Sequence, residues 1–140
     1  MDLSSHSGDI CAGRISAQKL KCSASSGSVT LGAVSAVTLV CDTSSGSADL
    51  RGICAEEIAV TARSGNVKLP IDSASGATVR TSSGRVVLTL PENGAELLYH
   101  SGSGKFHTSR SYERKGDLYL FGVGESDLDV ETSSGNLEIR

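Results

Sequence analysis

Cysteine is the residue type in this chain of 140 residues whose spacing most invites a chemical interpretation. Cys22 and Cys41 lie 19 positions apart, so they could share a disulfide or a metal ion, or they could be two small buried side chains. Cys11 and Cys54 fall at other positions of the repeat described below, and the sequence has no CxxC pair. A four-ligand zinc set is therefore not expected, and we interpret Cys22 and Cys41 as buried thiols.

The three histidines do not complete a catalytic pattern with the abundant serines. His6, His100 and His107 are accompanied by no Gly-x-Ser-x-Gly elbow of the kind that exposes a nucleophilic serine between a strand and a helix. The polar positions that follow the Ser-Gly dipeptides provide no pair of carboxylates for glycoside hydrolysis. We therefore predict no catalytic residue, no cofactor and no metal ion, and a protein that is not an enzyme.

A repeat of 19 residues runs through the sequence. Its marker is Ser-Gly, followed by one residue of any type and then by an apolar residue. The first four intervals between markers are 19 residues, the next is 20, and the last is 31, which equals one period plus an insertion of 12. The marker glycines are Gly8, Gly27, Gly46, Gly65, Gly84, Gly104 and Gly135.

Apolar residues recur at fixed distances from each marker, with the alternation of half-buried strands. The columns begin with Ile10 and Ala12 after the first marker, and with Leu20 and Cys22 before the second. Parallel stacking would align each column toward the interior. This predicts an all-β, single-domain parallel β-solenoid, or β-helix, of about seven coils of about 19 residues within 1–140. Regular coils would occupy 8–104, an insertion about 105–121, and a last coil 122–140.

Three details of the coil follow less directly. A third apolar stretch around Ile15, Val34 and Ile53 either forms a third side or belongs to a flattened two-sheet coil. The sequence has no signature of handedness. We expect the marker glycines to adopt the positive φ of a sharp turn, and the neighbouring Ser and Thr hydroxyls to bond the turn backbone.

Charge and hydropathy restrict the partners. A formal net charge of −3 and a pI near 5.5 argue against a nucleic-acid-binding protein, which needs a basic face. No run approaches the roughly 18 apolar residues of a membrane-spanning helix. The first residues do not have the pattern of a signal peptide, so we expect a cytosolic protein or a leader and anchor outside this sequence.

Two stretches with a Thr-Ser-Ser-Gly turn, Val79–Leu88 and Leu128–Ile139, resemble the bacterial β-strand-repeat "putative adhesin" family of unknown function. The segment Phe121-Gly-Val-Gly is similar to the family's C-terminal end, and the resemblance covers nearly the whole chain. It implies a β-solenoid in the cell envelope or outside the cell, and it supplies no catalytic residues. Four cysteines are unusual for such a surface protein, so a cytoplasmic location stays open.

All five aromatic residues lie between residues 99 and 121, the region of the insertion and of several basic residues. One interpretation is a loop or hairpin whose rings cover the flank of the solenoid. The other is a recognition patch, since exposed aromatic rings and arginines are typical interface anchors. The candidate patch consists of Phe106, His107, Arg110, Tyr112, Arg114, Lys115 and Tyr119.

The preferred function is a non-catalytic binding or structural module, adhesin-like or accessory to envelope stress, that engages an envelope component or a partner protein. The alternative is a scaffold that assembles through its solenoid ends, where strand edges are unpaired. A small carbohydrate-active enzyme is the third hypothesis. We expect Ile10, Ala12 and Ile15 to be exposed at the N-terminal end, and the C-terminal end to be equally abrupt, with the aromatic insertion lying over it.

Overall fold

A computed structural model describes residues 2–73, 75–89, 94–108, 112–116, 118–122 and 127–139. These residues form β-strands and turns, and no helix is found among them. The strands are β1 (Asp2–Ser5), β2 (Ile10–Ala24), β3 (Val29–Thr43), β4 (Ala48–Leu50), β5 (Ile53–Ala62), β6 (Val67–Ser73), β7 (Gly76–Thr81), β8 (Val86–Thr89), β9 (Gly94–Ser101), β10 (Phe106–Thr108), β11 (Glu113–Lys115), β12 (Leu118–Gly122), β13 (Asp127–Thr132) and β14 (Leu137–Ile139).

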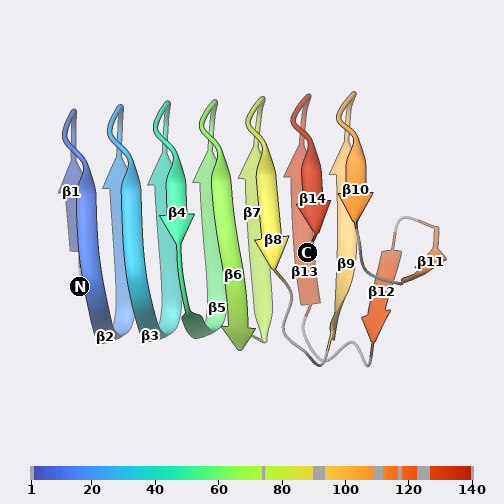
Figure 1. Cartoon of the computed structure of the whole chain (residues 1–140), viewed down its shortest axis with the longest axis horizontal. Coiled ribbons are helices and arrows are strands. Elements are labelled where there is room, and N and C mark those ends of the chain that lie inside the picture. The colour runs from blue at the N-terminus through green and yellow to red at the C-terminus, as the bar shows by residue number, and fades with distance from the viewer. Residues whose placement is uncertain are drawn as a thin grey trace.

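One continuous sheet curls into two layers that the Ser-Gly turns join along one edge (Figure 1). The layer ahead of each turn holds β1, the later part of β2 and β3, and then β5, β7, β13 and β9. The layer after each turn holds the first part of β2 and β3, and then β4, β6, β8, β14 and β10. Pairing within both layers is parallel, which confirms the predicted all-β, solenoid-like fold.

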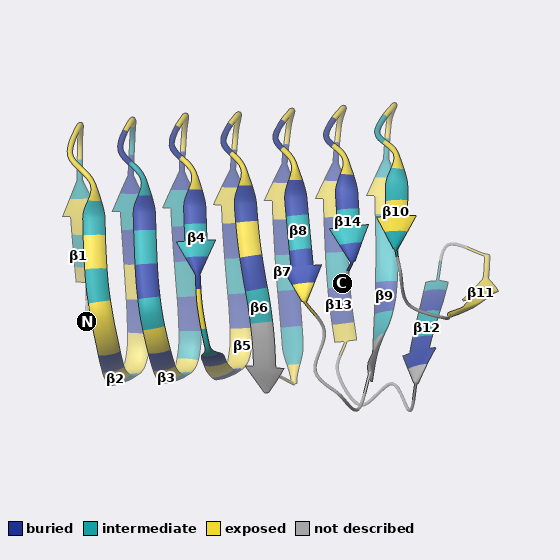
Figure 2. Cartoon of the chain, viewed as in Figure 1, coloured by how far each residue is buried: buried dark blue, intermediate teal, exposed yellow. Residues whose placement is uncertain are grey.

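The predicted columns are the core of the molecule. Leu39 pairs with Ile58, and Ile58 pairs with Ala77, so equivalent side chains stack from one strand to the next. Val29 and Val67 of the other layer are fully buried. Figure 2 shows these buried positions as bands that cross neighbouring strands. Burial of each such aliphatic side chain stabilises the fold by about 1.5–3 kcal/mol.

The third apolar stretch lies where the strands bend from one layer to the other. β2 and β3 each run for 15 residues through this bend. Ile15, Val34 and Ile53 are paired in register and buried there, so the expected exposure of Ile15 at the N-terminal end is wrong. Ala55–Ile58, whose local sequence is helix-like, lies inside β5. The coil is therefore flattened into two layers, and the third stretch fills the bend between them.

The final segment of the chain does not lie at the end of the stack. β13 pairs with β7 on one side and with β9 on the other, while β14 pairs with β8 and β10. β9 and β10 thus leave a position open beside β7 and β8, and β13 and β14 return to fill it. The expectation that the last coil of the chain forms the end of the solenoid is therefore wrong. The stack instead ends at β9 and β10, and β12 and β11 extend the β9 layer with antiparallel pairing.

Close packing, and not positive φ, explains the marker glycines. Among the described residues the glycines with positive φ are Gly52 and Gly116, neither of which is a marker. A Cβ added at Gly46 would lie 1.7 Å from the carbonyl oxygen of Gly27, so no larger residue fits between stacked turns. The expected hydroxyl bonds are present, as when Thr43 Oγ1 donates to the Gly46 carbonyl at 2.9 Å. The predicted positive φ is therefore wrong, whereas the predicted turn chemistry is confirmed.

Candidate functional site

The predicted patch lies at the end of the stack formed by β9, β10, β12 and β11 (Figure 1). β10 is the last strand of its layer, and β11 is the outermost strand beyond β9 and β12. Arg110 of the patch falls outside the described residues. The other members come from β10, from β12, and from residues 112–115 at and before β11.

The aromatic residues form one cluster against the flank of the solenoid. The Phe106 and Tyr119 rings are stacked, with centroids 4.7 Å apart. The Tyr112 ring lies 5.8 Å from that of Phe106 and 5.6 Å from that of Phe121. Tyr119 and Phe121 are 8% and 1% exposed, whereas Tyr112 is 43% exposed. Most of the cluster therefore covers the flank, as the first interpretation of the insertion predicts, and Tyr112 remains on the surface.

Tyr99 ends an inward column and joins this cluster. It pairs with Val130 in the neighbouring strand, and its ring lies 5.5 Å from that of Phe106. Its hydroxyl oxygen is buried and has no hydrogen-bond partner within the described part of the chain. A buried hydroxyl without a partner costs about 1–3 kcal/mol. This oxygen is thus an energetic weakness in the cover of the stack.

Strand alternation divides the basic residues of the patch between different surfaces. Phe106 packs toward the aromatic cluster, so its neighbours Lys105 and His107 point away from it and are exposed. The Arg114 guanidinium carbon lies 5.4 Å from the centroid of the Tyr119 ring, on the side of the cluster. Lys115 is opposite Leu118 and points to the other face of the β11–β12 hairpin. The patch is therefore a set of neighbouring surfaces around the hairpin.

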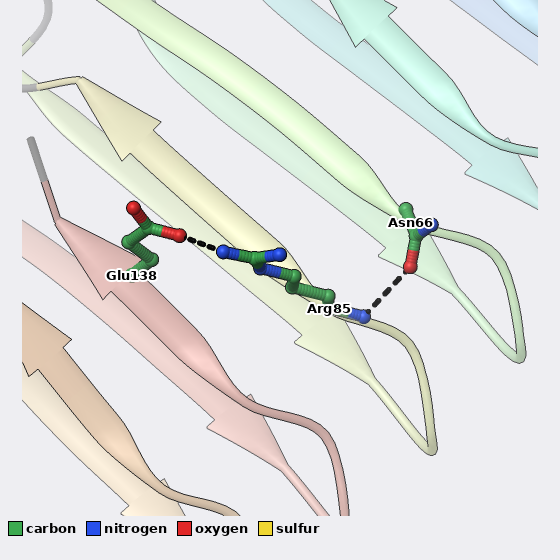
Figure 3. A network of polar contacts seen from close by, with 3 residues as sticks. All are labelled: Asn66, Arg85 and Glu138. Carbon is green, nitrogen blue, oxygen red and sulfur yellow. Dashed lines mark hydrogen bonds and ion pairs between the residues drawn. The ribbon is translucent and has the colours of Figure 1, made fainter.

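The outward side chains of β10 share a cleft of about 460 Å³ with two other strands. The Arg85 guanidinium forms an ion pair with the Glu138 carboxylate, and the Arg85 backbone N–H donates to Asn66 Oδ1 at 3.1 Å (Figure 3). Polar and charged side chains from three adjacent strands thus meet on one outer surface. The cleft is lined by Arg85, Lys105, His107, Asn136, Leu137 and Glu138.

The sequence analysis placed His107 in the candidate patch but missed the other members of this cleft. Arg85 and Glu138 are 53 positions apart, and they meet because β14 lies directly beside β8. The shared position of Asn66 and Asn136, each directly after a marker glycine, was the available signal for their common role. Both side chains accept a hydrogen bond from the backbone of the next turn in the stack.

The inner thiols belong to the core and not to a reactive site. Cys22 and Cys41 are adjacent in register, both are fully buried, and both are free. Burial raises the pKa of the Cys41 thiol to about 12, with smaller contributions from Cys22 and the Asp42 carboxylate. Burial, and then the charge of Asp2, also raises the pKa of Cys22. The predicted interpretation as buried thiols is confirmed.

Neither a metal cluster nor a membrane-spanning helix is evident in the described ranges. No group of three or more His, Cys, Asp or Glu side chains is arranged there to hold a metal ion. No helix in that part of the chain has the length and apolarity needed to cross a membrane.

Comparison with known proteins agrees with the architecture. The Toastrack DUF4097 family matches residues 1–140. No curated protein matches the sequence at a significant level. A crystal structure of a "putative cell adhesion protein" from Clostridium sporogenes superposes with a TM-score of 0.57, at 10% identity, over 98% of this chain and 92% of that chain. At that identity the likeness shows a shared fold. These matches confirm the resemblance seen in the repeats, and the chain belongs to the Toastrack DUF4097 family.

Proposed function

We propose that the chain is a non-catalytic binding module of the cell envelope, and that the surface around β10 and the β11–β12 hairpin contacts a negatively charged component. The family membership and the fold shared with a protein named for cell adhesion support a binding or structural role. The location in the envelope rests on the same likeness, and the choice of surface rests on the geometry described next.

The observation that carries the proposal is a set of exposed cations on neighbouring surfaces around an exposed aromatic ring, on an acidic protein. Lys105, Arg114 and Lys115 are exposed around the hairpin, and Tyr112 is among the most exposed large apolar side chains. Glu138 pairs with Arg85, and the exposed Glu113 of β11 offsets one of the three cations, which still leaves these described residues with an excess of positive charge although the whole chain carries −3. Cations beside an aromatic anchor suit an anionic, partly apolar partner.

Binding to an immobilised anionic polysaccharide, with dextran sulfate as the probe and neutral dextran as the reference, tests the proposal. The double variant Lys105→Ser/Lys115→Ser should weaken binding about tenfold, because each exposed charge contact contributes about two- to fivefold. The matched variant Arg14→Ser/Lys21→Ser removes the same charge from exposed positions of β2, at the other end of the stack, and should change binding less than twofold. Equal losses in both variants, or equal binding to neutral dextran, would contradict the proposal.

A second candidate function, assembly through the end of the stack, is favoured by the edge at β1 and β2. Ile10 and Ala12 are partly exposed there, whereas their register partners Val29 and Leu31 are fully buried. A second copy that paired with this edge would cover both side chains. Sedimentation at increasing concentration should then show oligomers that Ile10→Lys abolishes. A single monomeric species at all concentrations would exclude this function.

A further inference from the structure

A trough of about 630 Å³ lies on the outer face of the layer that contains β5, β7, β13 and β9. β3, β5, β7 and β13 each contribute three consecutive residues to its lining. The middle residues of these runs include Leu39, Ile58 and Leu128. These central residues are buried in the core, so their two neighbours point outward. The trough therefore crosses the strands between two outward rows of side chains. Its volume is in the range of sites that hold a ligand, about 300–1,000 Å³.

One of the two rows is mainly aliphatic. Val40 is paired with Ala59, and both line the trough from neighbouring strands. At the other end Leu98 is directly opposite Leu118, which β12 brings to the trough by antiparallel pairing with β9. These side chains form an apolar wall that a ligand could cover.

The other row is acidic. Glu57, Asp127 and Glu96 lie in it, and Asp127 is paired directly with Glu96. A fourth carboxylate, Asp129, projects from the aliphatic row beside Leu98. None of the described lining residues is basic, and the ion pairs found among the described residues involve none of these four. The described lining of the trough thus carries a formal charge of −4, against −3 for the whole chain.

An extended polypeptide fits this pair of rows. The trough crosses from β3 to β12, which are five strand spacings apart, or about 24 Å, the length of about seven extended residues. Alternate side chains of an extended strand point to opposite sides, so one set would reach the carboxylate row and the other set the aliphatic row. We propose that this trough binds an extended segment of a partner protein in which lysine or arginine alternates with aliphatic residues.

This site is separate from the cleft beside β10 that belongs to the proposed function. The trough lies on the layer ahead of the Ser-Gly turns, whereas Lys105 and His107 line a cleft on the layer after them. Lys115 is paired with Leu118 at the edge of the trough, so the independent comparison is between Lys105 and the trough carboxylates. Variants of these two sets can fail independently.

The probe is a capped seven-residue peptide in which lysine alternates with valine and leucine, and its binding is measured by fluorescence anisotropy. We expect it to bind at least about tenfold more tightly than the same peptide with glutamate in place of lysine, and several-fold more tightly than one with serine in place of the aliphatic residues. Added salt should weaken the binding, because exposed charges are screened. Spermine, which has the charge without the alternating side chains, should bind more weakly than the peptide.

Two neighbouring glutamates provide the matched variants. Glu57 lines the trough, whereas the exposed Glu56 beside it does not. Glu57→Gln should weaken peptide binding about two- to fivefold, Asp127→Asn/Asp129→Asn should weaken it further, and Glu56→Gln should leave it unchanged. Lys105→Ser should also leave it unchanged, because Lys105 lines the cleft on the other layer. Thermal melts of each variant confirm that the fold is retained.

Several results would overturn the proposal. Equal effects of Glu56→Gln and Glu57→Gln would show that the trough does not select the ligand. Equal affinity for spermine, or for the serine-containing peptide, would reduce the interaction to charge alone. Absence of binding to the lysine peptide would show that the trough is not a site for such a segment. A dimer of the chain itself that Asp127→Asn/Asp129→Asn dissociates would make a second copy the occupant instead.

Discussion

The side-chain oxygen of Asn136 accepts a hydrogen bond from the backbone N–H of Lys105 at 3.0 Å, although Lys105 precedes it by 31 positions. The backbone carbonyl of Asn136 accepts a second bond, from the N–H of Val86 at 2.8 Å. One residue thus joins β8 to β10 through the final segment of the chain. The same arrangement brings Glu138 to Arg85 and builds the cleft beside β10. The position of the final segment therefore decides both the end of the fold and the shape of the candidate site.

Gly135→Ala should destabilise the protein by about 2 kcal/mol or more. A Cβ at this position would lie 2.0 Å from the carbonyl oxygen of Gly84, and overpacking of this kind typically costs about 1–3 kcal/mol. Gly13→Ala is the matched control, because a Cβ there would meet no atom within 4 Å, and it should leave stability unchanged or raise it slightly. Urea denaturation measures both changes. Equal midpoints for the two variants would show that the turns of Gly84 and Gly135 are not stacked.

The stability of the fold should fall as the pH rises from about 9 toward 12. The folded state holds the pKa of Cys41 at about 12, above its ordinary value of 9.0, so the unfolded chain loses this proton first. The raised pKa contributes stability that is complete below pH 9 and is lost as the pH approaches 12, by at most about 1.4 kcal/mol per pH unit. Cys41→Val fits a column that already contains Val60 and should flatten this part of the profile. An unchanged slope in the variant would contradict the assignment.

Tyr99→Phe should keep or raise the melting temperature. The substitution removes a buried hydroxyl that has no partner among the described residues and keeps the ring that packs on Phe106. Tyr112→Phe changes an exposed side chain and should have little effect, so it serves as the control. A drop of several degrees for Tyr99→Phe would mean that this hydroxyl makes a hydrogen bond that stabilises the fold.

Amide hydrogens at the β1 and β2 end should exchange faster than those in the middle of the stack. Ile10 and Ala12 are partly exposed and belong to the edge of their layer, whereas Ala48 and Leu50 at the same repeat positions are buried between neighbouring strands. Edge strands open more readily, because fewer contacts are lost when they separate. Equal protection of the two segments in a monomer would contradict the weak edge and remove the main support for assembly through it.

Most of the fold can be predicted from the sequence because the repeat acts locally. Every turn needs a glycine at the marker and apolar residues at the inward positions. The stacking of Leu39, Ile58 and Ala77 can therefore be predicted from their spacing alone. The order of the last turns has no such signal. Any turn of this repeat can stack on any other, so the spacing of Gly84, Gly104 and Gly135 is compatible with either order. Only the long-range pairing distinguishes them.

The candidate site was less predictable for the same reason. The aromatic and basic residues around β10 could be recognised by composition, but Arg85 and Glu138 join them through the unexpected place of β14. The acidic trough was missed although Glu57 and Asp127 both lie eight residues before a marker glycine. The polar positions considered for paired carboxylates come after each marker glycine. The trough is lined by outward residues that come before the markers.

The central claim is that β13 lies between β7 and β9, and the most direct test is to identify which residue lies beside Arg80 on the outer face. Glu131 is paired with Arg80 on one side and with His100 on the other, so Arg80 and His100 are two strand spacings apart, about 9.6 Å. The test uses Cys11→Ser/Cys54→Ser as the background and a thiol crosslinker too short to span that distance. Arg80→Cys/Glu131→Cys should crosslink rapidly, and Arg80→Cys/His100→Cys should not. The opposite result would place the strands in sequence order and contradict the inserted final segment.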